Sequence, residues 1–172
     1  PLSPKIPSMH FNTRFLKTNQ EWFGGGIDIT PSLKFNAEEK YHTGLEKICN
    51  KYDKTYYPKY KKWCDDYFFL KHRKEARGIG GIFFDYLQTG DWGKDFEFVQ
   101  DVGMYFQNFV KTTLLALKDE EWTNDDKQIQ LSKRSRYAEF NLLYDRGTKF
   151  GLETGGNIDA ILMSMPPMAK WD

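Results

Sequence analysis

The chain has 172 residues, which is enough for one domain with a substantial hydrophobic core. Its 25 Lys and Arg residues nearly balance its 24 Asp and Glu residues, which argues against a protein held to nucleic acid or to a membrane surface by net charge. No apolar run reaches membrane-spanning length, and the two cysteines, Cys49 and Cys64, lack the spacing of metal ligands. We therefore expect packed thiols, no nucleic-acid partner and no membrane span.

The first pattern is a strand over residues 10–16, in which polar and apolar side chains alternate. Its polar side chains share one face: His10, Asn12 and Arg14. A polar link over residues 17–20 leads to the glycines at 24–26 and to a second alternating run over residues 27–30. The two runs predict a β-hairpin, which would bring Asp28 onto the same face as the three polar side chains.

The middle of the chain alternates between helical and strand patterns. Asn36 and Glu39 form a possible capping box for a first helix, and Pro58 favours the first turn of a second. Residues 77–87 are typical of a buried strand, and the apolar spacing over residues 94–117 predicts a long helix.

The last third begins with residues 123–126, which can cap a short basic helix that ends near Ser135. Residues 137–144 alternate again and predict another strand, and Gly155 and Gly156 predict a turn before the final apolar run. The order of hairpin, helices, strand, helices and strands favours an α+β fold with a largely antiparallel sheet.

The predicted polar face combines an imidazole, an amide, a guanidinium and a carboxylate. Arg14 offers a planar fork for a carboxylate, Asp28 can accept hydrogen bonds or act as a base, and the His10 imidazole can take up or release a proton. A solvated sheet face with an ordinary Arg–Asp pair explains the same pattern, so spacing alone leaves both interpretations open. The neighbouring glycines favour a site, because they remove side chains from the approach to Asp28.

Two further sets of residues leave alternatives open. His10, His42 and His72 lie on separate predicted elements without the spacing of a metal motif, so a three-histidine metal site is the weaker interpretation. Arg77 and Asp85 are either an anion clamp and its partner or the charged ends of a buried strand.

Four long segments resemble those of one enzyme family. They are WFGGGIDITP (22–31), YPKYKKWCDDYF (57–68), RGIGGIFFD (77–85) and EFNLLYDRGTKFGL (139–152). These segments are similar to those of the oxygen-dependent coproporphyrinogen III oxidases of haem (porphyrin) biosynthesis, and matching positions run from His10 to Trp171.

The resemblance implies oxidative decarboxylation of two propionates of coproporphyrinogen III, which gives protoporphyrinogen IX, with O₂ as the electron acceptor. It implies no organic cofactor and no metal, although His42 and His72 match proposed metal ligands of some bacterial members. It also implies a homodimer and a large, mostly antiparallel sheet flanked by helices. The expected location is the cytoplasm, with a mitochondrial or plastid location left open.

The resemblance also implies roles for particular residues. His10 matches a proton donor and Asp28 a carboxylate that engages the pyrrole N–H groups, so the expected catalytic residues are His10, Asp28 and Arg14. The expected substrate-binding residues form two stretches: Asn12, Thr13 and Arg14, then Gly155, Gly156 and Asn157. Asn157 stands where the family usually has an Arg, so the charged contact of that position is missing here.

Family chains extend before residue 1 and beyond residue 172. We therefore expect residues 1–172 to be a single coproporphyrinogen oxidase domain that lacks the family's N-terminal part and extreme C-terminus. A non-catalytic tetrapyrrole-binding fragment or module is the alternative function.

Overall fold

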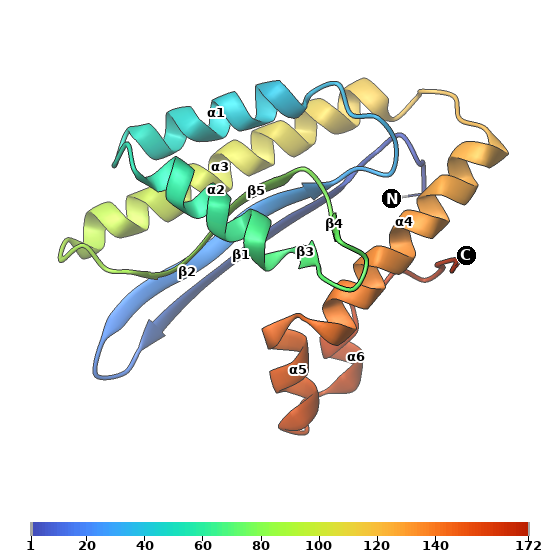
Figure 1. Cartoon of the computed structure of the whole chain (residues 1–172). Coiled ribbons are helices and arrows are strands. Elements are labelled where there is room, and N and C mark those ends of the chain that lie inside the picture. Colours follow the sequence, from blue (N-terminus) through green and yellow to red (C-terminus); the bar gives the residue numbers. More distant parts are fainter. Residues whose placement is uncertain (1, 172) are drawn as a thin grey trace.

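A computed structural model describes residues 2–171. Its centre is an antiparallel sheet of three strands in the order β1-β2-β5, with β1 at Ser8–Lys17, β2 at Glu21–Thr30 and β5 at Gly80–Leu87 (Figure 1). The predicted hairpin is confirmed, because β1 pairs with β2 along its whole length from Ser8 opposite Thr30 to Lys17 opposite Glu21. The glycines at 24–26 belong to β2 itself rather than to a loop.

Helices α1 (Glu38–Asn50) and α3 (Trp92–Leu117) pack on the apolar face of the sheet (Figure 1). The alternation of β2 turns Ile27 and Ile29 towards these helices, and both side chains are fully buried. The main core consists of these isoleucines and the apolar residues that pack on them, which include Tyr41, Leu45, Ile82, Phe84, Phe98 and Val102. This core leaves the opposite face of the sheet to the polar side chains.

A second, smaller core lies beside the polar face. Helix α2 (Tyr56–Tyr67) runs along β5, and the two-stranded ribbon of β3 (Phe69–Leu70) and β4 (Glu75–Ala76) follows it. Helix α4 (Asn124–Leu143) closes this core with Phe140, which packs with Cys64, Phe68, Leu70 and Phe83. Helices α5 (Arg146–Glu153) and α6 (Ile158–Ile161) project away from the sheet below α4 (Figure 1).

The strand predicted over residues 137–144 is wrong, because these residues continue helix α4 to Leu143. The predicted cap is confirmed: the Thr123 hydroxyl accepts from Asp126 N–H, and the Asp126 carboxylate accepts from Thr123 N–H. The helix does not end near Ser135. Its buried residues Tyr137, Phe140 and Asn141 follow a helical spacing, whereas Leu142, which the alternating pattern put on the same side as Phe140, is 48% exposed.

The size of the sheet and the starts of two helices also differ from the prediction. The α+β class is confirmed, but the sheet has three strands with a separate two-stranded ribbon and is not large. The capping box at Asn36 does not form, since α1 follows Ala37 without a side-chain cap. Helix α2 begins at Tyr56, two residues before the predicted start at Pro58. The predicted glycine turn is confirmed, with Gly155 at a φ of 70°.

Candidate functional site: the polar face of the sheet

The polar face is assembled by the register of the hairpin. His10 lies opposite Asp28, Asn12 opposite Gly26 and Arg14 opposite Gly24. The even-numbered positions of both strands therefore share the face that points away from the main core. Because two of the positions on β2 are glycines, the middle of this face carries no side chains from the central strand.

Asp28 lies at one end of the polar face and is almost fully buried. Its Oδ1 accepts a hydrogen bond from Arg77 Nη2, and His10 Nδ1 lies 3.5 Å from its Oδ2. Burial raises the pKa of Asp28, but the Arg77 guanidinium, together with His10, outweighs it and holds the pKa below its ordinary value. Asp28 is therefore a stable carboxylate at neutral pH, suited to accepting hydrogen bonds and weak as a general base.

Arg77 is buried with Asp28 and is held by aromatic rings. Its guanidinium carbon lies 3.8 Å from the ring centroid of Phe68, 4.8 Å from that of Phe140 and 5.2 Å from that of Tyr137. These contacts fix the planar group and offset part of the cost of removing it from water. The polar face is thus anchored to α4 through an ion pair that the solvent does not reach.

His10 is the more accessible partner of Asp28, with 42% of its side chain exposed. Its Nδ1 is buried and makes no hydrogen bond of ordinary geometry within residues 2–171. An imidazole with one nitrogen directed at a carboxylate and its body open to solvent can pass a proton to a bound ligand.

Arg14 lies in the middle of the face and is paired across the sheet with Asp85 of β5. Asp85 Oδ1 accepts from Arg14 Nε at 2.9 Å and also from Arg14 Nη2. Arg14 Nη1 donates to Asn12 Oδ1 at 3.0 Å. One N–H on each terminal nitrogen of the guanidinium makes no hydrogen bond within the described residues, and a carboxylate could use both.

The expected substrate residues outside this face are not brought to it. Thr13 lies opposite Gly25 and is exposed on the other side of the sheet. Gly155, Gly156 and Asn157 connect α5 to α6, where Asn157 Oδ1 accepts from Ala160 N–H at 3.2 Å and caps α6. Within residues 2–171, no hydrogen bond or ion pair joins this turn to the polar face.

The three histidines have separate environments. His42 lies between the Tyr57 hydroxyl and the Ile79 carbonyl, 3.0 Å from each, so both of its nitrogens are used. His72 likewise contacts the Tyr144 hydroxyl and the Glu139 carboxylate, each at 2.8 Å. Across the part of the chain that the structure describes, no three His, Cys, Asp or Glu side chains gather to hold a metal ion.

Sequence reasoning did not find the true partners of Arg77 and Asp85. It considered them as partners of each other, but the structure pairs Arg77 with Asp28 and Asp85 with Arg14. The available signal was strand register, since Phe83 lies opposite Gly26 and Asp85 is two residues further along β5. Recognising that signal required knowing that β5 lies beside β2 and not elsewhere in the sheet.

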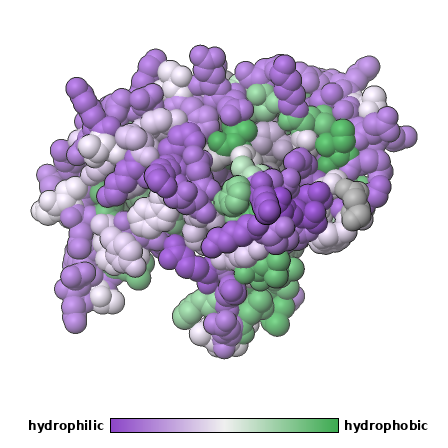
Figure 2. Space-filling model, in the orientation of Figure 1, coloured by the Kyte–Doolittle hydropathy of each residue, from purple (hydrophilic) through white to green (hydrophobic). Residues whose placement is uncertain are grey.

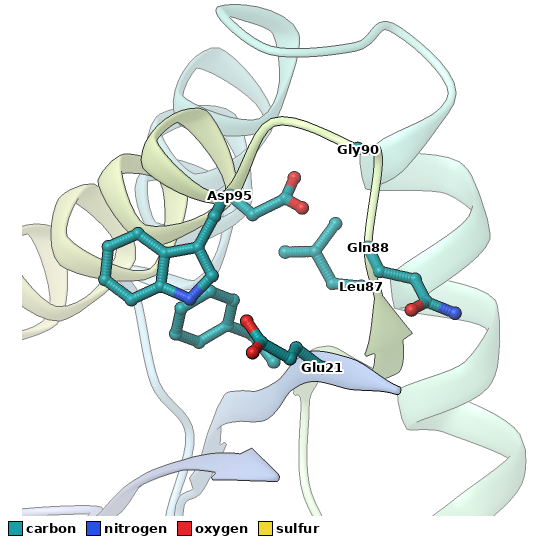
Figure 3. A pocket seen from close by; sticks show the side chains of 7 residues that line it. Glu21, Leu87, Gln88, Gly90 and Asp95 are labelled. Carbon is teal, nitrogen blue, oxygen red and sulfur yellow. The ribbon is translucent and has the colours of Figure 1, made fainter. Parts of the chain in front are cut away.

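A separate cavity of about 400 Å³ lies between the start of β2 and the start of α3. Figure 3 shows Glu21, Leu87, Gln88 and Asp95 around it. The Asp95 carboxylate is engaged there, because it accepts hydrogen bonds from the backbone N–H and the hydroxyl of Thr89, both at 2.8 Å. This carboxylate therefore holds the turn before α3.

The comparisons with known proteins all point to one enzyme family. A family profile described as coproporphyrinogen III oxidase matches residues 1–172. The chain is 55% identical over 171 residues to the oxygen-dependent coproporphyrinogen-III oxidase of Rickettsia akari, a match that covers 99% of this chain and 61% of that protein. The enzymes of the same name from Rickettsia bellii and Rickettsia rickettsii are 55% and 54% identical, over 98% and 99% of this chain.

The chain spans 61% of the length of these relatives. No helix among residues 2–171 is long and apolar enough to cross a membrane. The match of the family profile nevertheless extends over every residue of the chain, including both strands of the hairpin and all of α4. The chain therefore belongs to the coproporphyrinogen III oxidase family.

Proposed function

We propose that the chain acts in the oxygen-dependent oxidative decarboxylation of coproporphyrinogen III to protoporphyrinogen IX, in haem (porphyrin) biosynthesis. Each of two propionate side chains loses its carboxyl group as CO₂, and the methylene carbon attached to the pyrrole ring loses a hydrogen with its bonding electrons, while the electrons of the broken carbon–carboxyl bond form the new double bond. A vinyl group remains, and O₂ takes up the two electrons. In this proposal residues 1–172 form one domain, which binds the tetrapyrrole and needs no organic cofactor.

The observation that carries the proposal is the partly exposed guanidinium of Arg14, on the same face of the sheet as His10 and Asp28. Gly24 and Gly26 of the central strand are themselves covered, by the Arg14–Asp85 ion pair and by the Phe83 ring. Each terminal nitrogen of Arg14 keeps one N–H that makes no hydrogen bond within residues 2–171, and these two groups can bind a propionate carboxylate. Membership of the family makes a tetracarboxylate porphyrinogen the substrate that fits this arrangement.

In this proposal His10 supplies the acid–base chemistry and Asp28 supplies a fixed charge. Asp28 stays ionised beside Arg77 and provides a fixed negative charge for pyrrole N–H groups or for the electron-poor transition state. His10 lies between Asp28 and solvent, where it can donate or accept a proton as the propionate side chain reacts.

Trp22 and Tyr86 form an aromatic border at the other end of the polar face. Their ring centroids are 4.7 Å apart, and Trp22 lies on the Gly24 side of β2. Tyr86 has a φ of 56°, which is costly for a bulky residue and is typical of functional sites. An aromatic pair of this kind, with Tyr86 exposed and Trp22 half-buried, would cover part of an apolar macrocycle.

We also propose that the protein forms a homodimer through α5, α6 and the segment that follows. Figure 2 shows apolar atoms gathered over α5 and α6 at the bottom of the view. The large exposed side chains of this region are Phe150, Leu152, Ile158 and Met163. Exposed apolar surface of this kind is typical of protein interfaces. Sedimentation velocity would test the proposal, since a monomer at all protein concentrations would contradict it.

Oxygen uptake with coproporphyrinogen III tests the catalytic proposal. Arg14→Ala and Asp28→Ala should each lower turnover by a factor on the order of 100 or more. Asp101→Asn is the matched control, because Asp101 pairs with Lys51 and Tyr52 on the other side of the sheet and should keep normal turnover. Near-normal activity in both site variants would refute the assignment of the site.

The alternative is a non-catalytic tetrapyrrole-binding module, which the uncharged Asn157 favours, since its side chain caps α6. It predicts that the purified chain quenches porphyrin fluorescence without consuming oxygen. Measurable oxygen uptake that depends on the substrate would exclude this alternative.

A further inference from the structure

We propose that Asp85 is the residue that positions Arg14, and that position 24 is a glycine so that this ion pair can cross the central strand. The inference rests on the proposed function, in which Arg14 binds a carboxylate of the substrate. It adds to that site one residue that positions Arg14, and the requirement that position 24 carry no side chain.

The two partners come from the two outer strands of the sheet. Arg14 is on β1 and Asp85 on β5, with β2 between them. Since neighbouring strands lie about 4.8 Å apart, the two backbones are roughly 10 Å apart, and the side chains must meet above β2. In register, the residue of β2 below this meeting point is Gly24, which lies opposite Arg14.

The surroundings of Gly24 explain why no other residue stands there. A Cβ atom on Gly24 would collide with Asp85 Oδ1 and would lie 2.8 Å from Arg14 Nε. Gly24 is not among the described residues with positive φ, so the backbone conformation does not require a glycine. The ion pair itself therefore excludes a side chain at position 24.

The neighbouring glycines differ in this respect. A Cβ on Gly25 would lie 2.7 Å from the backbone oxygen of Asn12, and one on Gly26 would lie 2.5 Å from that of Ile82. Substitution at either position would force the strands apart. Substitution of Gly24 would instead press on three side-chain atoms, those of Asp85, Arg14 and Trp22, and leave the strand pairing in place. Gly24→Ala is thus a way to disturb the ion pair without removing a charged group.

The burial of the pair shows how it orients Arg14. The Asp85 side chain is only 10% exposed, whereas that of Arg14 is 35% exposed. The Asp85 carboxylate accepts hydrogen bonds from Arg14 Nε and Nη2, and Asn12 Oδ1 accepts one from Nη1, so the guanidinium cannot rotate freely. The two unused N–H groups are then fixed in direction, which lowers the entropy lost when a carboxylate binds.

A competing effect makes the inference testable. If Asp85 mainly neutralised Arg14 and competed with the substrate carboxylate, its removal would strengthen binding of an anionic ligand. If it positions Arg14, its removal weakens that binding. The two effects have opposite signs in one measurement.

The experiment uses Asp85→Asn, Gly24→Ala and the double variant of the full chain. Quenching of coproporphyrin III fluorescence gives the Kd for a stable tetracarboxylate porphyrin, and nitrogen-15 NMR follows the Arg14 Nε–H, identified by its loss in Arg14→Lys. Both single variants should weaken binding about tenfold or more and should expose the Nε–H to exchange. The double variant should be no weaker than Asp85→Asn alone, since both changes act through one ion pair.

Two controls separate this effect from general damage. Asp101→Asn removes an acidic partner elsewhere, and Gly103→Ala adds a Cβ at an ordinary 3.5 Å from the Phe11 ring. Both should keep the wild-type Kd and Nε–H signal. Tighter binding in Asp85→Asn, or an Nε–H signal that survives in either site variant, would overturn the inference. A wild-type protein with a protected Nε–H but no porphyrin binding would refute the proposed function and leave the positioning intact.

Discussion

Removal of the Arg77 guanidinium tests whether the polar face depends on a buried ion pair. In Arg77→Met the aliphatic part of the side chain is largely retained, but the buried Asp28 carboxylate loses its charged partner. Breaking a buried pair in this way costs about 3–5 kcal/mol, because one uncompensated charge is left out of water. Since a domain has only about 5–15 kcal/mol of stability, the variant should unfold at a much lower urea concentration.

The dependence on pH follows from the pKa of Asp28, which Arg77 and His10 lower against the effect of burial. A carboxyl group whose pKa is lowered by folding stabilises the protein above its unfolded pKa of about 3.9, and this contribution is lost as the pH falls. Without Arg77, burial raises the pKa of Asp28, and protonation relieves the buried charge. The difference in unfolding free energy between wild type and Arg77→Met should therefore shrink as the pH falls from about 7.5 to about 5.

Urea denaturation monitored by tryptophan fluorescence measures this difference at each pH. The control is Arg77→Met made in an Asp28→Asn protein. In this background the substitution should lower the free energy of unfolding clearly less, because no buried carboxylate is left without a partner. A loss below about 1 kcal/mol in Arg77→Met would refute the reasoning, since that value is typical of a solvent-exposed pair. An equal loss in both backgrounds would refute it as well.

Three further predictions concern α4 and its contacts. Phe140→Ala should cost about 3–5 kcal/mol in urea denaturation, whereas Leu142→Ala, at a position 48% exposed, should change stability by about 0.5 kcal/mol or less; similar losses would contradict the helical assignment. Thr123→Ala removes the cap of α4 and should lower the free energy of unfolding by about 1 kcal/mol; an unchanged midpoint of urea denaturation would contradict this. Hydrogen bonds from Arg73, His72 and Trp171 outweigh partial burial and lower the pKa of Glu139 to about 2. The free energy of unfolding should therefore fall less steeply in Glu139→Gln than in the wild type as the pH is lowered from 4.5 to about 2. An unchanged dependence on pH would contradict this.

The sequence by itself determined the features that depend on residues close together in the chain, namely the faces of the hairpin strands and the cap of α4. The period of two placed His10, Asn12 and Arg14 on one side of a strand, and the polar link predicted the hairpin that brings Asp28 beside His10. The cap of α4 also follows from local chemistry, since Thr123 and Asp126 are only three residues apart. The resemblance of long segments indicated the family, and the comparisons confirmed it.

Only the tertiary structure decided which charges pair and how α4 continues. Residues 137–144 are compatible with both periods, and burial of Phe140 against Phe68 and Phe83 selects the helix. Arg77 and Asp85 lie in the same short segment of the sequence, but the order of the strands pairs Arg77 with Asp28 and Asp85 with Arg14. The physical reason is that a charged side chain removed from water needs an opposite charge within a few ångströms, and the chain path in space determines which one is available.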